Sequence, residues 1–115
     1  MNLEQNFLTG RNPVMYEIRY LPLARKDLTD IVAYISSHLK APKAAIDLLD
    51  ALDKSISRLG QYPYSCKVYQ PVKALKNEYR LLPVKNYAVF YVVKAQVVEI
   101  HRIVYARLDL TRIIK

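Results

Sequence analysis

Hydrophobic and polar residues alternate at the first regular segment of the chain. Residues 15–21 place Tyr16, Ile18 and Tyr20 in alternation with charged neighbours, and a period of two with β-rich side chains is typical of a strand. Pro22 comes next, and proline is well suited to the first turn of a helix. The pattern therefore predicts a strand that is followed directly by a helix.

Two longer segments then carry apolar residues at intervals of three and four, which is the spacing of one helix face. The first segment spans residues 23–39, and its apolar stripe consists of Leu28, Ile31, Ile35 and Leu39. The second begins near Pro42 and stops at Gly60, with a stripe of Ala45, Leu48, Leu49, Leu52, Ile56 and Leu59. These helices, joined by a short loop, are expected to form a hairpin whose apolar faces need a sheet to cover them.

The second half of the chain reads as loop and then as strands. Residues 61–78 show no period and predict a loop with room for a short strand, whereas residues rich in Val, Ile, Tyr and Phe predict strands at 78–84, 87–93 and 97–105. Residues 108–115 predict a short terminal helix, and residues 1–14 are expected to be a dispensable tail. The predicted order is β-α-α-β-β-β-α, an α+β domain of residues 15–115 with a helical hairpin on a mostly antiparallel sheet.

The composition narrows the class of protein. A chain of 115 residues suits one domain, and 52% hydrophobic residues with only 2 glycines exclude a disordered or collagen-like chain. One cysteine, Cys66, excludes an internal disulfide and favours a reducing compartment. Neither a membrane-spanning apolar run nor the residue order of a secretion signal is apparent, so we expect a soluble cytoplasmic protein.

The net charge of +8 is distributed unevenly. Residues 1–57 hold seven basic and seven acidic side chains, whereas residues 58–115 hold eleven basic side chains and three acidic ones. The whole excess therefore lies in the second half. Such asymmetry indicates a surface for an anionic partner, either a nucleic acid or an acidic protein segment, although it also fits a solvated basic face.

The sequence lacks the residue patterns of a metal site or of a nucleotide-binding loop. His38 and His101 lie far apart, and Cys66 has no partner at the spacing of a metal site. The two glycines, Gly10 and Gly60, exclude a glycine-rich phosphate loop. We therefore expect no metal and no cofactor.

Basic and aromatic residues gather instead on the last three predicted strands. Arginine or lysine could stabilise charge on a phosphate and tyrosine or histidine could move a proton, so metal-independent phosphodiester chemistry is possible. The set comprises Arg80, Lys85, Tyr87, Tyr91, His101, Arg102, Tyr105 and Arg107. The competing interpretation is structural, because residues 87–93 are apolar on both faces and Tyr87 and Tyr91 then belong to the core.

The alternation along residues 97–105 predicts two different faces for the last strand. One face is expected to carry Val98, Ile100 and Val104 together with Arg102. The opposite, more polar face, where a ligand could lie, is expected to carry Glu99, His101, Ile103 and Tyr105.

Four segments, in the same order, resemble the RelE/ParE family of toxins. Residues 24–35 (ARKDLTDIVAYI) resemble its first-helix motif A-x-x-D-L-x-x-I-x-x-Y-I, and residues 42–45 (PKAA) resemble the start of its second helix. Residues 80–91 (RLLPVKNYAVFY) are similar to its hairpin R-x-L-x-V-x-x-Y-x-V-F-Y. Residues 100–109 (IHRIVYARLD) are similar to its closing R-V-L-H-G-R-R-D. The resemblance implies a growth-inhibiting toxin of a type II toxin–antitoxin pair, held inactive by an acidic antitoxin in a hetero-oligomer.

The family contains two mechanisms. RelE-like and YoeB-like members cleave mRNA on the ribosome, whereas ParE-like members poison DNA gyrase without cutting nucleic acid. If this chain is a ribonuclease, the resemblance implies Arg80, Arg107 and Tyr105 as catalytic residues. Two basic positions of the ribonucleases are occupied here by Leu82 and Ala88, which weakens that assignment.

The first-helix motif instead favours the ParE branch, the plasmid-stabilisation proteins. Contacts with the target or with nucleic acid are then expected from Lys85, His101, Arg102, Lys73 and Lys76. A toxin that has lost its activity and only binds its antitoxin is the third interpretation.

Overall fold

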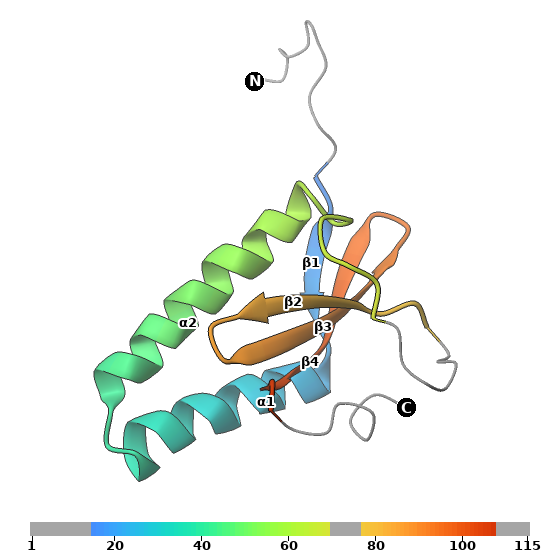
Figure 1. The fold of residues 1–115 in the computed structure, drawn as a ribbon. Coiled ribbons are helices and arrows are strands. Elements are labelled where there is room, and N and C mark those ends of the chain that lie inside the picture. The colour runs from blue at the N-terminus through green and yellow to red at the C-terminus, as the bar shows by residue number, and fades with distance from the viewer. Residues whose placement is uncertain (1–14, 70–76, 108–115) are drawn as a thin grey trace, which may run out of the picture.

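A helical hairpin covers one face of a four-stranded sheet in the computed structural model, which describes residues 15–69 and 77–107 (Figure 1). The elements follow in the order β1 (Glu17–Tyr20), α1 (Pro22–Ala33), η2 (Tyr34–His38), α2 (Pro42–Ser57), η3 (Arg58–Gly60), β2 (Arg80–Val84), β3 (Tyr87–Lys94) and β4 (Val97–Tyr105). The predicted α+β fold is confirmed as far as the last strand. The predicted tail at 1–14 and the predicted terminal helix at 108–115 lie outside the described residues.

The sheet has the strand order β1-β4-β3-β2. β2 pairs with β3 and β3 with β4 in antiparallel fashion, whereas β1 is parallel to β4. The loop before β2 adds an isolated bridge between Val68 and Arg80, so the short strand anticipated in residues 61–78 is reduced to a single pairing among the residues described there. The sheet is therefore mostly antiparallel, as predicted.

Both helices begin at a proline, Pro22 and Pro42, because the missing N–H of proline costs nothing in the first turn. The first helical segment differs from the prediction at its end, where residues 34–38 widen into a π-helix. Leu39 follows this turn and is 54% exposed rather than packed. Leu49 of α2, also predicted on the apolar stripe, is 39% exposed because it lies at the border of the buried face.

Gly60 ends the second helical segment, as predicted, and its lack of a side chain has a local reason. The carbonyl oxygen of Gly60 accepts a hydrogen bond of 2.8 Å from the N–H of Tyr16. A Cβ atom at Gly60 would lie 3.3 Å from the carbonyl oxygen of Tyr16. The close approach of η3 to β1 therefore favours glycine at this position.

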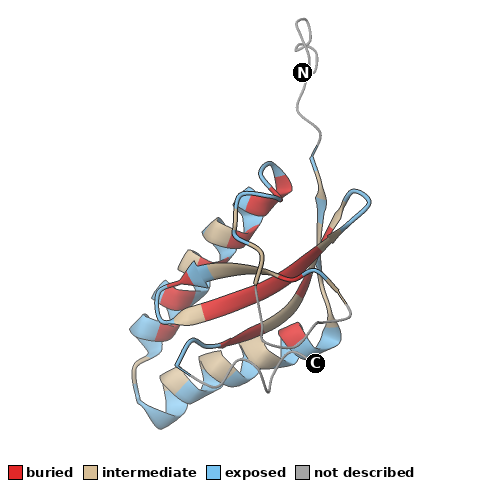
Figure 2. Ribbon diagram, turned by 45° about the vertical axis from the view of Figure 1, so that its right-hand side comes forward, coloured by how far each residue is buried: buried red, intermediate tan, exposed pale blue. Residues whose placement is uncertain are grey.

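The core is built on β3, which is buried on both faces (Figure 2). Val89 and Tyr91 pack toward the helices, against the buried stripe of α2 that includes Leu52 and Ile56. Phe90 belongs to a second cluster on the opposite face, which also contains Tyr79, Ala88, Val92 and Val104. The interpretation of Tyr91 as a core residue is confirmed, since its side chain is fully buried and its hydroxyl donates a hydrogen bond of 2.9 Å to the carbonyl oxygen of Pro63.

The predicted faces of β4 are wrong after Ile100. Phe90 pairs with Arg102 and Tyr91 with Ile100, so His101 is an extra residue that has no partner on β3. A bulge of this kind shifts the alternation by one position. As a result Ile103 packs with Val98 and Ile100 under the helices, and Val104 joins the cluster on the other face.

No helix in the described part of the chain is long and apolar enough to cross a membrane.

Candidate functional site

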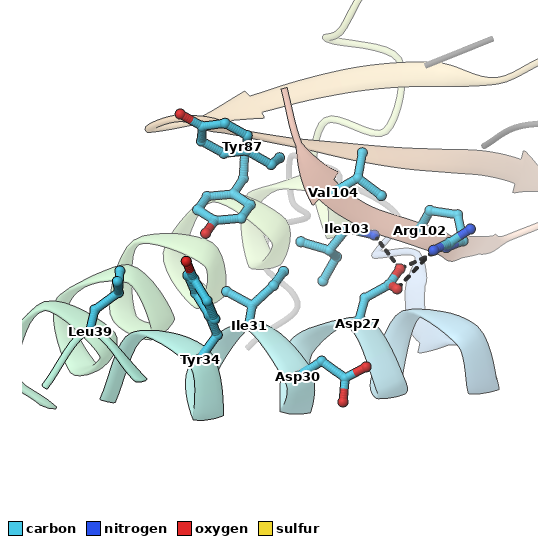
Figure 3. A pocket seen from close by; sticks show the side chains of 10 residues that line it. Asp27, Asp30, Ile31, Tyr34, Leu39, Tyr87, Arg102, Ile103 and Val104 are labelled. Carbon is cyan, nitrogen blue, oxygen red and sulfur yellow. Dashed lines mark hydrogen bonds and ion pairs between the residues drawn. The ribbon is translucent and has the colours of Figure 1, made fainter. Parts of the chain in front are cut away.

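A groove of about 630 Å³ lies between the C-terminal half of the first helical segment and the adjoining ends of β3 and β4. We call it the aromatic groove. Its lining consists of Asp27, Asp30, Ile31, Tyr34 and Leu39 from the first helical segment and its end, and of Tyr87, Arg102, Ile103, Val104 and Tyr105 from the sheet (Figure 3).

Aromatic side chains form the walls of this groove. The rings of Tyr87 and Tyr105, which are paired across β3 and β4, meet edge to face with 5.6 Å between their centroids. On the facing helix Tyr34 stacks on His38 at 4.9 Å. Tyr34 and Leu39 are more than half exposed, so the groove presents a large apolar surface to solvent. Burial raises the pKa of Tyr87 above its ordinary value.

The polar end of the groove is closed by an ion pair. Asp27 accepts hydrogen bonds from Nε of Arg102 at 2.7 Å and from a second guanidinium nitrogen at 2.9 Å (Figure 3). Its Oδ2 atom also accepts the N–H of Ile103 at 2.9 Å. These bonds raise the pKa of Arg102, because they favour its charged form. Arg102, predicted to contact a target, is thus held in place by α1.

One predicted binding residue, Lys85, and one predicted catalytic residue, Arg107, lie at the same end of the sheet as this groove. Lys85 is in the turn between β2 and β3, and Arg107 follows β4. A hydrogen bond of 2.9 Å from the N–H of Ala106 to the carbonyl oxygen of Asn86 joins that turn to the end of β4. Lys85 and Arg107 are both exposed. The structure therefore brings Lys85, Arg107 and Tyr105 together beside an apolar surface.

Arg80 is located elsewhere and is engaged by the loop before β2. Its guanidinium donates a hydrogen bond of 2.7 Å to the carbonyl oxygen of Cys66 and lies 5.0 Å from the ring centroid of Tyr64. Arg80 pairs with Tyr91, whereas Tyr105 pairs with Tyr87. Arg80 and Tyr105 are thus four residues apart along the strand direction, about 13 Å, and β3 lies between their strands.

His101 lies at the bulge of β4 in a hydrogen-bonded chain. Its Nδ1 atom is 3.2 Å from the hydroxyl of Tyr79, and its Nε2 atom is 3.1 Å from a carboxylate oxygen of Glu99. Since a carboxylate can only accept, Nε2 carries the proton in the neutral ring and Nδ1 accepts from Tyr79. Both nitrogens of His101 are therefore engaged by neighbouring side chains. The remaining predicted residues, Lys73 and Lys76, lie outside the described residues.

Most of the helix residues in the groove were not predicted as site residues from the sequence, among them Asp27, Ile31 and Tyr34. A signal for them existed, because all three are fixed letters of the first-helix motif A-x-x-D-L-x-x-I-x-x-Y-I. Their spacing of four and three places them on one face of the helix. Within residues 15–69 and 77–107, no group of three or more His, Cys, Asp or Glu side chains could hold a metal ion.

These features define a small α+β domain with an aromatic groove. The sequence matches the family model described as the ParE toxin of the type II toxin–antitoxin system, parDE, over residues 18–110. The chain therefore belongs to the ParE toxin family, which confirms the resemblance and the preference for this branch.

Comparison with solved structures shows the same fold in another protein. A chain from the chromosomal ParDE TA system of P. aeruginosa superimposes with a TM-score of 0.66 and 19% identity, covering 81% of this chain and 98% of that one, and shows the same fold. TrmO from P. aeruginosa matches with a TM-score of 0.45 and 10% identity over 90% of this chain and 40% of its own. No curated protein sequence matches the chain.

Proposed function

We propose that this protein is a cytoplasmic, cofactor-free toxin that stops growth by binding DNA gyrase and does not cut nucleic acid. Membership of the ParE family supports the toxin assignment. The contacts of Arg80 are the observation that favours inhibition by binding over cleavage of RNA. Cleavage of RNA without a metal needs charged groups that converge on one phosphate. Here the guanidinium of Arg80 is hydrogen-bonded to the carbonyl oxygen of Cys66 and lies over the ring of Tyr64. It is therefore separated from Tyr105 and Arg107, which lie at the other end of the sheet.

A cognate antitoxin is proposed to occupy the aromatic groove. The exposed rings and Leu39 offer anchor points for apolar side chains of a partner segment that becomes ordered on binding. Lys85 and Arg107 flank this surface and favour a segment that carries carboxylates. Such a segment would offset part of the basic excess of residues 58–115 and form a toxin–antitoxin hetero-oligomer.

Induction of the protein without antitoxin, followed by a supercoiling assay with purified gyrase, tests the proposed target. We expect growth arrest, and inhibition of supercoiling in proportion to toxin concentration. A preparation of the toxin bound to its antitoxin is the control and should leave supercoiling unchanged. Unimpaired growth after induction of folded protein would instead support an inactive, antitoxin-binding relic.

The alternative mechanism, a RelE-like or YoeB-like ribonuclease, predicts a different readout. Transcript 5′ ends are mapped after induction of the wild type, of Arg107→Ala and of Arg80→Lys, which keeps the charge at the loop. Site-specific cuts that disappear in these variants would overturn the gyrase proposal. Unchanged transcripts together with arrested growth support it.

The groove itself is tested by pull-down with the antitoxin. Leu39→Asp and the double variant Lys85→Ala/Arg107→Ala should weaken capture, because the first places a charge on the apolar surface and the second removes the flanking charges. Lys43→Ala, an exposed lysine at the start of α2, is the matched control and should bind like the wild type. Equal binding by all of these variants would exclude the groove as the antitoxin site.

A further inference from the structure

A second cavity, of about 570 Å³, lies between the C-terminal end of α2 with η3 and the edge strand β2. Its polar lining consists of Ser55, Arg58, Tyr62 and Ser65, and its floor includes Leu82 and Pro83. We call it the arginine–hydroxyl pocket. None of these residues belongs to the aromatic groove, and the proposed gyrase inhibition makes no use of them.

The charges of the described residues make this pocket suitable for an anion. The aromatic groove includes Asp27 and Asp30, and a smaller cavity between α1 and α2 includes Asp50 and Asp53. No carboxylate is among the described residues that line the arginine–hydroxyl pocket. One guanidinium and three hydroxyl groups can all donate hydrogen bonds, and this is the donor set that phosphate oxygens accept.

One exposed aromatic ring lines the same pocket, since Tyr62 is 58% exposed. Tyr64, two residues further along the loop, is engaged by the Arg80 guanidinium, which lies 5.0 Å from the centroid of its ring. The loop that carries them is fixed from both sides, because the Tyr91 hydroxyl bonds to the carbonyl oxygen of Pro63 at 2.9 Å and Arg80 bonds to that of Cys66 at 2.7 Å. These bonds anchor the backbone of the loop next to Tyr62, which lowers the entropic cost of ordering the loop on binding.

We propose that the arginine–hydroxyl pocket binds single-stranded nucleic acid. Arg58 and the hydroxyls of Ser55 and Ser65 hold a phosphate group, and the exposed ring of Tyr62 stacks on the neighbouring base. A run of acidic side chains, as in polyglutamate, would also satisfy Arg58, but it offers no aromatic ring to stack on Tyr62. A base inside a duplex is already stacked on both sides, so the strand that fits is unpaired.

Fluorescence anisotropy with a short labelled oligothymidylate, titrated with the full-length protein, tests this proposal. Tyr62→Ala is expected to raise Kd about tenfold, as for the loss of one stacked base, whereas Tyr62→Phe keeps the ring and should bind like the wild type. Arg58→Gln is expected to weaken binding and to lower the slope of log K against log salt concentration by about 0.7, the share of one phosphate contact on a single strand.

Matched controls distinguish binding at the arginine–hydroxyl pocket from a general electrostatic attraction of the oligonucleotide to a basic protein. Lys85→Ala/Arg107→Ala removes two charges from the other basic surface and should change Kd less than Arg58→Gln does. Equal weakening by both would overturn the proposal, as would undetectable binding or tighter binding of the duplex with oligoadenylate. Displacement of the oligonucleotide by an equal concentration of polyglutamate would assign the pocket to an acidic peptide instead. Unchanged thermal unfolding of each variant shows that folding is intact.

Discussion

Asp27 in α1 and Arg102 in β4 are 75 residues apart in the sequence and are joined by two hydrogen bonds of 2.7 and 2.9 Å. The same carboxylate accepts the N–H of Ile103 at 2.9 Å. β1 ends at Tyr20, opposite Ile100, so no strand formed by residues 15–69 or 77–107 lies beside the edge of β4 beyond this point. Asp27 accepts hydrogen bonds at this edge in place of a neighbouring strand. It thereby connects the first helix to the sheet at the end of the aromatic groove.

Asp27→Asn should lower the free energy of unfolding by about 2 kcal/mol, because Arg102 then remains half-buried without a counter-ion. Chemical denaturation of the two proteins measures this difference. Asp30→Asn, three residues along the helix, removes an exposed pair with Lys26 and should cost less than about 0.5 kcal/mol. Equal losses from the two variants would show that the Asp27–Arg102 pair has no special role.

Tyr91 makes stability depend on alkaline pH. Burial raises the pKa of the Tyr91 hydroxyl above that of an unfolded tyrosine, about 10. The unfolded chain therefore loses this proton first, and the stabilisation is complete below about pH 10 and is lost as the pH rises further. We expect the wild type to lose stability above pH 10 more steeply than Tyr91→Phe does.

The stabilities of the wild type and Tyr91→Phe are also compared near pH 7, where the hydroxyl of Tyr91 is neutral in both the folded and the unfolded chain. Tyr91→Phe loses the hydrogen bond to the carbonyl oxygen of Pro63 and should be about 1 kcal/mol less stable near pH 7. Tyr62→Phe removes an exposed hydroxyl and should follow the wild type at every pH. Parallel stability curves for the wild type and Tyr91→Phe would contradict the predicted shift.

Ala95 in the turn between β3 and β4 has a φ of 53°, a left-handed conformation that strains residues with a side chain. Ala95→Gly relieves this strain, and we expect a gain of about 1 kcal/mol in the free energy of unfolding. Ala33→Gly, at an exposed position of α1, is the matched control and should lose a similar amount, since glycine weakens a helix. Thermal denaturation of both variants shows whether each change raises or lowers the free energy of unfolding. A destabilised Ala95→Gly would contradict the predicted strain.

Removal of residues 1–14 tests whether the domain begins at residue 15. β1 starts at Glu17, and Tyr16 already donates its N–H to Gly60, so the described core is complete without the first fourteen positions. The truncated protein should keep its circular dichroism spectrum, with a Tm within about 4 °C of the full chain, the equivalent of about 1 kcal/mol. A larger drop would mean that the segment contributes to the fold.

Periodicity and residue type were sufficient for the elements of this fold but not for the orientation of every side chain. Alternation located the first strand, an abundance of Val, Ile, Tyr and Phe located the other three, and intervals of three and four located both helices. The rule of alternation misplaced Ile103 and Val104, because a bulge at His101 depends on how β4 pairs with β3 and leaves no mark in the alternation itself. Likewise, the exposure of Leu39 follows from the π-helical turn before it, which the helix period does not anticipate.

The candidate sites show a similar division. The sequence by itself determined the family, through motifs whose letters include Asp27, Ile31 and Tyr34, and it located the basic excess in the second half. Only the tertiary structure decided what each charge does. It paired Arg102 with Asp27, hydrogen-bonded Arg80 to a loop carbonyl, and placed the exposed Arg58 in one pocket with the ring of Tyr62. The physical reason is that the identity of a side chain sets its chemistry, whereas its partners come from segments far away in the chain.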